Sequence, residues 1–284
     1  MMRFLPPVRA PCDDAYTRAA VFRSGGDERL LDSRQQAVGM QLLVVGSGEM
    51  GRWFARASGA DGVAFADIKP ETARAAAEAD PNDDARAVAL DTDERFDIVC
   101  IAVPMSAVPE AIADHAGGAT EAIVDVSGEM RDAVDALRAH ADGRERASFH
   151  PLFSAANAPG NVPVVVDRGG PTTERLREAL TAAGNEVFGT TPSAHDRAME
   201  TVQAKAHTAV LAYALVADDV DPRFHTSLSG PLSELVEGVT GNTPEVYAEI
   251  QARFEGAEEV VAAAERLADA DREAFLELYG EADP

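Results

Sequence analysis

The chain is poor in lysine and tryptophan, and its basic charge is far smaller than its acidic charge. Only two of its 25 basic residues are lysine, and 49 acidic residues bring the formal net charge to −24. Such a charge disfavours nucleic acid or an anionic membrane surface as a partner. An acidic surface maintains solubility where salt screens its self-repulsion. The composition therefore indicates a protein adapted to a high-salt cytoplasm, as in a halophilic archaeon.

Cysteines and long apolar runs are also scarce. Cys12 and Cys100 are the two cysteines, and Cys100 lies inside an apolar run, so we expect a buried thiol rather than a disulfide. No apolar stretch reaches the roughly 18 residues that a membrane span needs, and the N-terminus lacks the apolar core of a secretory signal. No cluster has metal-binding spacing. We expect a soluble, cytoplasmic protein without a metal site.

Residues 1–39 differ from the rest of the chain. They carry six arginines, five acids and no apolar periodicity. We expect this segment to be disordered, or to be a mis-called extension ahead of a natural start at Met40. A basic targeting arm is the alternative, which the interspersed acids disfavour. The remaining length is enough for two domains, which we predict at 40–190 and 191–284.

From Met40 onward, short apolar runs alternate with alanine-rich helical stretches, a pattern typical of a parallel sheet covered by helices on both faces. The expected strands are 41–46, 63–67, 86–90, 96–103, 121–126, 147–150, 162–167 and a weaker one at 186–188. They predict an α/β, Rossmann-type doubly wound sheet. Thr191-Pro192 then starts a helix, and helical apolar spacing continues to the C-terminus. We expect an all-helical domain there, whose apolar faces pack chiefly into its own core, with part of that core at a homodimer interface.

A glycine-rich turn follows the first strand and has the pattern G-x-G-x-x-G. Its residues are Gly46, Ser47, Gly48, Glu49, Met50 and Gly51. In a strand–turn–helix setting these glycines permit a tight turn, close approach of a pyrophosphate and close helix packing, although an ordinary βα turn can share the pattern. Asp67 ends the next strand, where a carboxylate binds ribose hydroxyls or, alternatively, caps a helix. The turn and Asp67 predict NAD, while Lys69 leaves NADP open.

Two later strand ends carry candidate residues for the cofactor and the chemistry. We expect Val103 and Pro104, at the end of the fourth strand, to lie beneath the nicotinamide. His150 ends another strand and Pro151 holds it extended, so its imidazole is suited to take a proton as hydride leaves, although alone it would be read as structural.

Substrate contacts are expected from three further side chains. Ser127 follows a strand in a small polar turn. Gln203 and His207 are four residues apart and share one helix face, whereas His195 lies about 120° away from His207 on an ideal helical wheel. A buried hydrogen-bonded pair is the alternative for Gln203 and His207.

Taken in order, these motifs resemble the prephenate and arogenate dehydrogenases of tyrosine biosynthesis, over about residues 40–280. The resemblance rests on Gly46 to Gly51, Val103-Pro104, Asp125, His150-Pro151-Leu152-Phe153, and the run from His195-Asp196-Arg197 through Gln203 to His207. It implies a dinucleotide domain joined to a helical dimerisation domain. It also implies oxidative decarboxylation of prephenate to 4-hydroxyphenylpyruvate, or of arogenate to tyrosine, with hydride transfer to NAD(P). His150 would be the base on the ring hydroxyl, and His207, the second expected catalytic residue, would line the substrate pocket.

The chain departs from the family pattern at two places. Ser127-Gly128-Glu129-Met130 replaces a Ser-Val-Lys turn, and an arginine expected shortly before Pro244 is missing. The substrate carboxylates then need other partners, for which Arg197, Lys205 and Arg223 are candidates. Two alternatives stay open. One is another two-domain NAD(P)-dependent enzyme, a β-hydroxyacid dehydrogenase or imine reductase that uses Lys205, and the other is a non-catalytic NAD(P)-binding regulatory protein.

Overall fold

The structure is a computed structural model that describes residues 39–283. The predictions for the N-terminal extension and for Cys12 lie outside the described residues. Cys100 is a free, buried cysteine, as expected from its apolar surroundings.

The centre of the fold is an eight-stranded sheet with the strand order β3-β2-β1-β4-β5-β6-β7-β8. Its strands are β1 Gln41–Val45, β2 Gly62–Ala66, β3 Arg86–Ala87, β4 Phe96–Ile101, β5 Ala119–Asp125, β6 Glu145–Phe149, β7 Asn161–Arg168 and β8 Glu186–Gly189. The first six strands are mutually parallel and follow the doubly wound order 3-2-1-4-5-6. This confirms the predicted Rossmann-type fold, and the order reverses between β1 and β4.

The edge of the sheet differs from the all-parallel prediction, because β7 runs antiparallel to β6. The chain leaves β6 at Phe149 and enters β7 at Asn161, with only a short 3-10 turn at Ala155–Asn157 between them. A parallel pairing needs a longer crossover, usually a helix, so this connection can only return along the same edge. The N–H of His150 donates to the carbonyl of Pro163 (3.0 Å), which extends the pairing one residue past β6.

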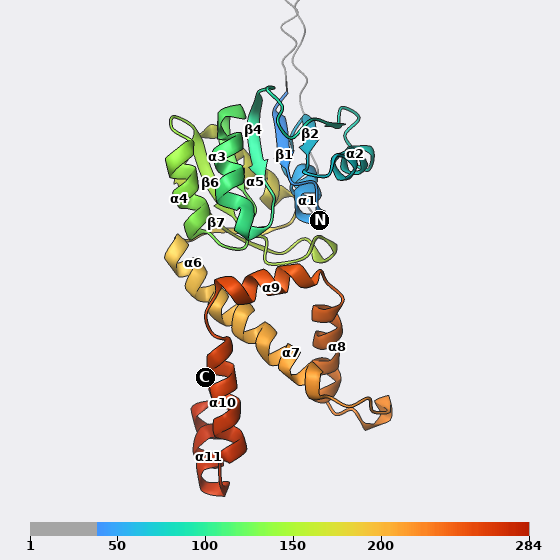
Figure 1. The fold of residues 1–284 in the computed structure, drawn as a ribbon, viewed down its shortest axis with the longest axis vertical. Coiled ribbons are helices and arrows are strands. Elements are labelled where there is room, and N and C mark those ends of the chain that lie inside the picture. Colours follow the sequence, from blue (N-terminus) through green and yellow to red (C-terminus); the bar gives the residue numbers. More distant parts are fainter. Residues whose placement is uncertain (1–38, 284) are drawn as a thin grey trace, which may run out of the picture. The chain divides into compact units, whose positions relative to one another are not determined.

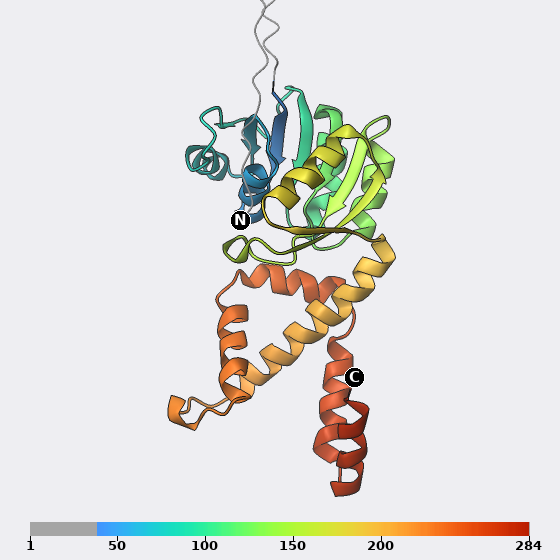
Figure 2. The same cartoon turned by 180° about the vertical axis from the view of Figure 1, so that it is seen from behind.

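Helices cover both faces of the sheet. They are α1 Glu49–Ala57, α2 Pro70–Glu78, α3 Val108–His115, α4 Arg131–His140 and α5 Pro171–Ala182. Figure 1 shows α3 and α4 in front of the sheet, and Figure 2 shows α1 and α5 on the opposite face. Phe54 and Leu176 pack into the core on one face, and Ile112 and Leu137 pack into the core on the other. The alternation of strand side chains thus supplies both cores.

Helices follow the sheet from Pro192 to the end of the described chain. They are α6 Pro192–Met199, a π-helical turn at Glu200–Lys205, α7 Ala206–Val216, a 3-10 turn at Pro222–Phe224, α8 Ser229–Thr240, α9 Pro244–Arg253, α10 Ala257–Asp269 and α11 Arg272–Glu281. Thr191 Oγ1 accepts a hydrogen bond from the N–H of Ala194, which confirms the predicted helix start. The change from strands to helices coincides with the predicted boundary, although the division into two domains remains a prediction. Within residues 39–283, no helix has the length and apolarity that a bilayer crossing requires.

Candidate active site

The glycine-rich turn joins β1 to α1 at the point where the strand order reverses. Gly46 has a φ of 95°, and a Cβ there would overlap the carbonyl oxygen of Ala102. A Cβ on Gly51 would overlap the carbonyl oxygen of Gly46. Packing therefore requires glycine at both positions. A Cβ on Gly48, by contrast, would have no atom within 4 Å.

The open space at Gly48 lies at the start of α1. Gly48 is the N-cap of this helix and gives it no side-chain cap. The first N–H groups of a helix have no partner within the helix, and they carry a partial positive charge. Backbone donors beside an open space at a strand-order reversal suit the pyrophosphate of a dinucleotide, which would contact the turn from Ser47 to Met50.

Asp67 lies directly beside this turn, as the sequence predicts. Its carboxylate accepts hydrogen bonds from the N–H groups of Ser47 and Lys69, both at 2.9 Å. These bonds fix the carboxylate after β2 and leave it further lone pairs for ribose hydroxyls. Val103 and Pro104 follow β4, the strand that pairs with β1 on its other side. The residues at this end of the sheet therefore fit a dinucleotide cofactor.

His150 is the centre of a buried hydrogen-bonded chain. Its Nδ1 lies 2.8 Å from Nε2 of His195, and Nδ1 of His195 lies 2.9 Å from Oδ1 of Asp196. On the other side of the ring, Nε2 of His150 lies 3.4 Å from Nε2 of Gln203. The structure thus brings two of the predicted site residues, His150 and Gln203, into contact.

Electrostatics keep the His150 ring neutral. Burial lowers the pKa of His150 to about 3, with a further lowering by His195 and an opposing effect of Asp196. Burial opposes ionisation of Asp196, but hydrogen bonds from His195 and from the N–H of Met130 lower its pKa below the usual value. At neutral pH the site therefore holds a neutral imidazole and a carboxylate. A neutral imidazole is the form that can accept a proton.

Gly128 and Met105 border the reactive side of the His150 ring. A Cβ on Gly128 would lie 3.6 Å from Nε2 of His150 and 2.9 Å from Sδ of Met105. Met105 belongs to an apolar cluster with Met199, Ala204, Ile250 and Phe254, against which Leu152 packs. The Glu249 carboxylate of α9 accepts hydrogen bonds from the N–H of Met105 (2.9 Å) and the hydroxyl of Ser106 (2.6 Å). These contacts join the helices to the loop after β4 beside His150.

His207 lies on the same helical run as Gln203, but not on a regular α-helix. The π turn at Glu200–Lys205 inserts an extra residue, so the predicted helical wheel is wrong across this segment. The His207 ring contacts the Tyr247 ring of α9, with 4.7 Å between their centroids, and burial lowers its pKa. Among the described residues, Nδ1 of His207 and Oε1 of Gln203 are buried without a hydrogen-bond partner. A ligand or water must supply these partners.

The other predicted substrate contacts have different surroundings. The Ser127 hydroxyl is buried and lies 2.6 Å from Oδ1 of Asp125 and 2.8 Å from the carbonyl oxygen of Glu129. It thus stabilises its own turn. Arg197 is exposed, on α6 next to the buried Asp196. Substrate binding by Ser127 and Arg197 remains a prediction.

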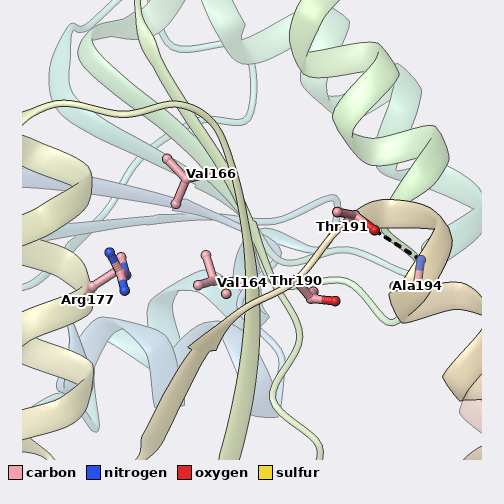
Figure 3. A pocket seen from close by; sticks show the side chains of 7 residues that line it. Val164, Val166, Arg177, Thr190, Thr191 and Ala194 are labelled. Atoms are coloured by element: carbon pink, nitrogen blue, oxygen red, sulfur yellow. Dashed lines mark hydrogen bonds between the residues drawn. The ribbon is translucent and has the colours of Figure 1, made fainter.

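A cavity of about 550 Å³ lies elsewhere, over β7 and the start of α6. Figure 3 shows Val164, Val166 and Arg177 on one side of it and the hydrogen bond from Ala194 to Thr191 on the other. None of the predicted site residues lines this cavity. Within residues 39–283, no group of three metal-binding side chains is arranged to hold an ion.

His195 and Asp196 are the site residues that sequence reasoning missed. The helical wheel placed His195 away from His207, and of these two histidines only His207 was assigned to the pocket. The adjacent imidazole and carboxylate at the start of a helix were the available signal, because a buried pair of this kind orients a neighbouring group. Their contact with His150 spans 45 residues of sequence and depends on the tertiary fold.

Asp125 ends β5 beneath the site and is fully buried. Its Oδ1 accepts hydrogen bonds from Ser127 and from the Ser148 hydroxyl, and burial nevertheless raises its pKa to about 6. Because the pKa is higher in the folded than in the unfolded chain, this group stabilises the fold at low pH, and the contribution is lost as pH rises through about 4 to 6.

We expect Asp125→Asn to remove this pH dependence. Urea unfolding at about pH 5 and about pH 8 should show that the wild type loses about 1.4 kcal/mol more than the variant over this interval. The exposed Asp83→Asn is the matched control and should follow the wild type. Equal losses in wild type and Asp125→Asn would contradict the raised pKa.

Comparisons with known proteins were made for both sequence and structure. No family model matches the chain. The 4-amino-4-deoxyprephenate dehydrogenase of Streptomyces pristinaespiralis is 28% identical, with 86% of this chain and 90% of the relative covered.

Solved structures share the fold over most of the chain. The prephenate dehydrogenase of Aquifex aeolicus, in complex with hydroxyphenyl propionate and NAD+, has a TM-score of 0.65 at 17% identity and covers 85% of this chain and 92% of its own. The arogenate dehydrogenase of Synechocystis has a TM-score of 0.55 at 15% identity, with coverages of 85% and 97%. At these identities the solved structures and this chain share a fold.

Proposed function

We propose that the protein oxidatively decarboxylates prephenate to 4-hydroxyphenylpyruvate, or arogenate to tyrosine, with hydride transfer to NAD(P). The observation that carries this proposal is the neutral, buried imidazole of His150 at the carboxyl end of β6. The same end of the parallel strands carries the dinucleotide turn at Gly46 to Gly51. A base and the binding site for a hydride acceptor would thereby lie at the same end of the sheet, the carboxyl ends of its parallel strands.

Each step of the reaction assigns a task to this chain. The bound nicotinamide supplies a two-electron hydride acceptor. Nε2 of His150 accepts the proton of the ring hydroxyl as hydride leaves the carbon that bears this hydroxyl. The ring carboxylate then departs as carbon dioxide, its bonding electron pair completes the aromatic ring, and His150 returns the proton to the ring oxygen. Orientation of the two reactants is the main contribution of the protein.

The proposed cofactor is NAD, with NADP as the alternative. The fixed carboxylate of Asp67 suits two ribose hydroxyls and repels a 2′-phosphate. The nearby Lys69 side chain is exposed and its charge is the feature that favours NADP. For the substrate, we propose contacts with His207, Gln203, Ser127 and Arg197.

A second candidate substrate carries a ring amine instead of the hydroxyl. The relative from Streptomyces pristinaespiralis is named for 4-amino-4-deoxyprephenate. In this chain, Oε1 of Gln203 is a buried acceptor without a partner, on the side chain that reaches Nε2 of His150. An amine has more N–H donors than a hydroxyl has O–H donors, so it could donate to both Oε1 of Gln203 and Nε2 of His150.

The contacts of Lys205 disfavour the alternative of a lysine-dependent β-hydroxyacid dehydrogenase or imine reductase. Its Nζ lies 2.6 Å from the Glu259 carboxylate of α10, and a Cβ on Gly256 would crowd its stem. The ammonium is therefore already paired. The imidazole of His150 is the better placed proton acceptor.

We further propose a cytoplasmic, salt-adapted homodimer formed through the C-terminal helices. The apolar helix α7 has no buried residue, and Leu215 and Val216 are 86% and 79% exposed. Leu228, Leu276 and Tyr279 on or beside later helices are exposed as well. A second copy would cover such faces. Light scattering should give twice the chain mass of 30.0 kDa, and a monomer in molar salt would contradict the dimer.

The function is tested by a spectrophotometric screen of the purified protein in molar salt. Prephenate, arogenate and 4-amino-4-deoxyprephenate are each paired with NAD and with NADP, and reduction of the cofactor is followed by absorbance. We expect turnover with at least one pair and a preference for NAD. Binding of NAD without turnover of any substrate would favour the regulatory alternative, and absence of both would overturn the cofactor proposal as well.

A further inference from the structure

The hydrogen-bonded chain behind His150 consists of two side chains with no role in the function proposed above. His195 and Asp196 lie in the first turns of α6 and are 3% and 6% exposed, and His150 itself is 6% exposed. The two contacts that join the three side chains measure 2.8 and 2.9 Å. All three side chains are thus largely shielded from bulk solvent.

The direction of these hydrogen bonds follows from the carboxylate end. An ionised carboxylate only accepts hydrogen bonds, so Nδ1 of His195 must carry its proton toward Asp196. With one proton on each ring, Nε2 of His195 then accepts from Nδ1 of His150. The lone pair of His150 is left on Nε2, the nitrogen that faces Gly128 and Gln203.

The surroundings hold Asp196 in the ionised form. Its Oδ1 also accepts from the N–H of Met130 (3.2 Å), and Nε of Arg131 lies 3.8 Å from its Oδ2. The Glu129 carboxylate faces the same region, where burial and then Asp196 raise its pKa. Glu129 accepts hydrogen bonds from the N–H groups at the start of α4, so its main partners lie away from His195.

We propose that His195 and Asp196 are positioning residues that hold the His150 imidazole with its lone pair on Nε2. The dyad also faces the positive charge that His150 acquires when it takes a proton, and the negative charge of Asp196 stabilises that state through His195. Serine proteases use a carboxylate on a catalytic histidine in the same way, and loss of that carboxylate costs about 10⁴-fold in kcat. The longer path here, through a second imidazole, gives a smaller expected effect.

The kinetic test rests on the proposed function and uses a double-mutant cycle. His195→Leu removes the acceptor for Nδ1 of His150, and we expect kcat to fall about 10²-fold with little change in the KM for NAD. His195→Gln offers an amide oxygen as acceptor and should stay within about tenfold of the wild type. Asp196→Asn should lower kcat in the wild-type background but not in His195→Gln, because Asp196 acts through His195. If the losses in kcat from His195→Gln and Asp196→Asn were additive, Asp196 would not act through His195, and the proposal would be overturned.

Exposed Ser193 on the same helix turn supplies the control variant, Ser193→Ala, which should leave kcat and unfolding unchanged. If His195→Leu does not fold, the test rests on His195→Gln and Asp196→Asn, which nearly preserve side-chain volume. Equal kcat values in wild type, His195→Leu and Asp196→Asn would overturn the proposal.

A substrate-free measurement separates this proposal from the proposed function. In protein labelled with nitrogen-15 at histidine, ring chemical shifts report which nitrogen of His150 carries the proton. We expect Nδ1–H in the wild type and in His195→Gln, and a mixture or Nε2–H in His195→Leu. A proton on Nε2 of His150 in the wild type would overturn the positioning role of His195 and Asp196 even if the enzyme is active. The expected tautomer without turnover of any screened substrate would support this positioning role and overturn the proposed function alone.

Discussion

His150→Asn is expected to lower kcat by about 10³-fold without changing the affinity for NAD, because a positioned general base contributes about 10²- to 10⁴-fold. An amide cannot accept a proton at neutral pH, whereas the imidazole of His150 is held neutral for that task. Asn keeps an N–H that can donate to Nε2 of His195, so the buried pairing is preserved. The glycine turn and Asp67 follow other strands, β1 and β2, so the cofactor site should remain intact.

Steady-state kinetics and a separate NAD titration check this expectation. The control is His140→Asn, since His140 is exposed at the end of α4 and has no part in the site. Activity within tenfold of the wild type would show that another group takes the proton. If both NAD binding and activity were lost, His150 would have a structural role, as many buried histidines do.

The sequence was informative wherever the signal was local. A strand followed by glycines, an acid at the end of the next strand and His150 before proline were all readable, because each depends on a few adjacent residues. Gly46, Asp67 and His150 consequently lie where the pattern predicts, at the carboxyl ends of strands. The short third strand was overestimated, because only Arg86 and Ala87 pair with β2.

The features that were not predicted depend on contacts between distant segments. β7 returns antiparallel because its connection to β6 is too short for a crossover, a length that the expected strands at 147–150 and 162–167 already implied. The π turn before His207 changes the phase of the helix, and no residue type announces it. The contacts of the Ser127 hydroxyl with Asp125 and with the carbonyl oxygen of Glu129 were not predicted either, and substrate binding by Ser127 stays a prediction. Residue type predicted that these segments carry chemistry, and packing determined which atoms meet.

Gly51→Ala and Gly48→Ala should separate the two tasks of the glycine turn. The methyl group that Gly51→Ala adds would overlap the carbonyl oxygen of Gly46 and lie 2.9 Å from Cγ1 of Val44, and neither a backbone carbonyl nor a buried strand side chain can move far. Overpacking of this kind costs about 1–3 kcal/mol, so we expect a loss of about 3 kcal/mol in the free energy of unfolding. NAD binding should be lost as well, because the start of α1 must shift.

Gly48→Ala is the matched variant in the same turn. Its methyl group enters space with no atom within 4 Å, so the free energy of unfolding should change by less than about 1 kcal/mol. The affinity for NAD should nevertheless fall about tenfold or more, because that space is where a pyrophosphate approaches the backbone. Urea unfolding and NAD titration of both variants measure these effects. Unchanged NAD affinity in Gly48→Ala would place the cofactor elsewhere, and unchanged stability in Gly51→Ala would show that the strand and helix can separate without cost. The two glycines thus differ in kind: one is required by the fold, and the other by the ligand.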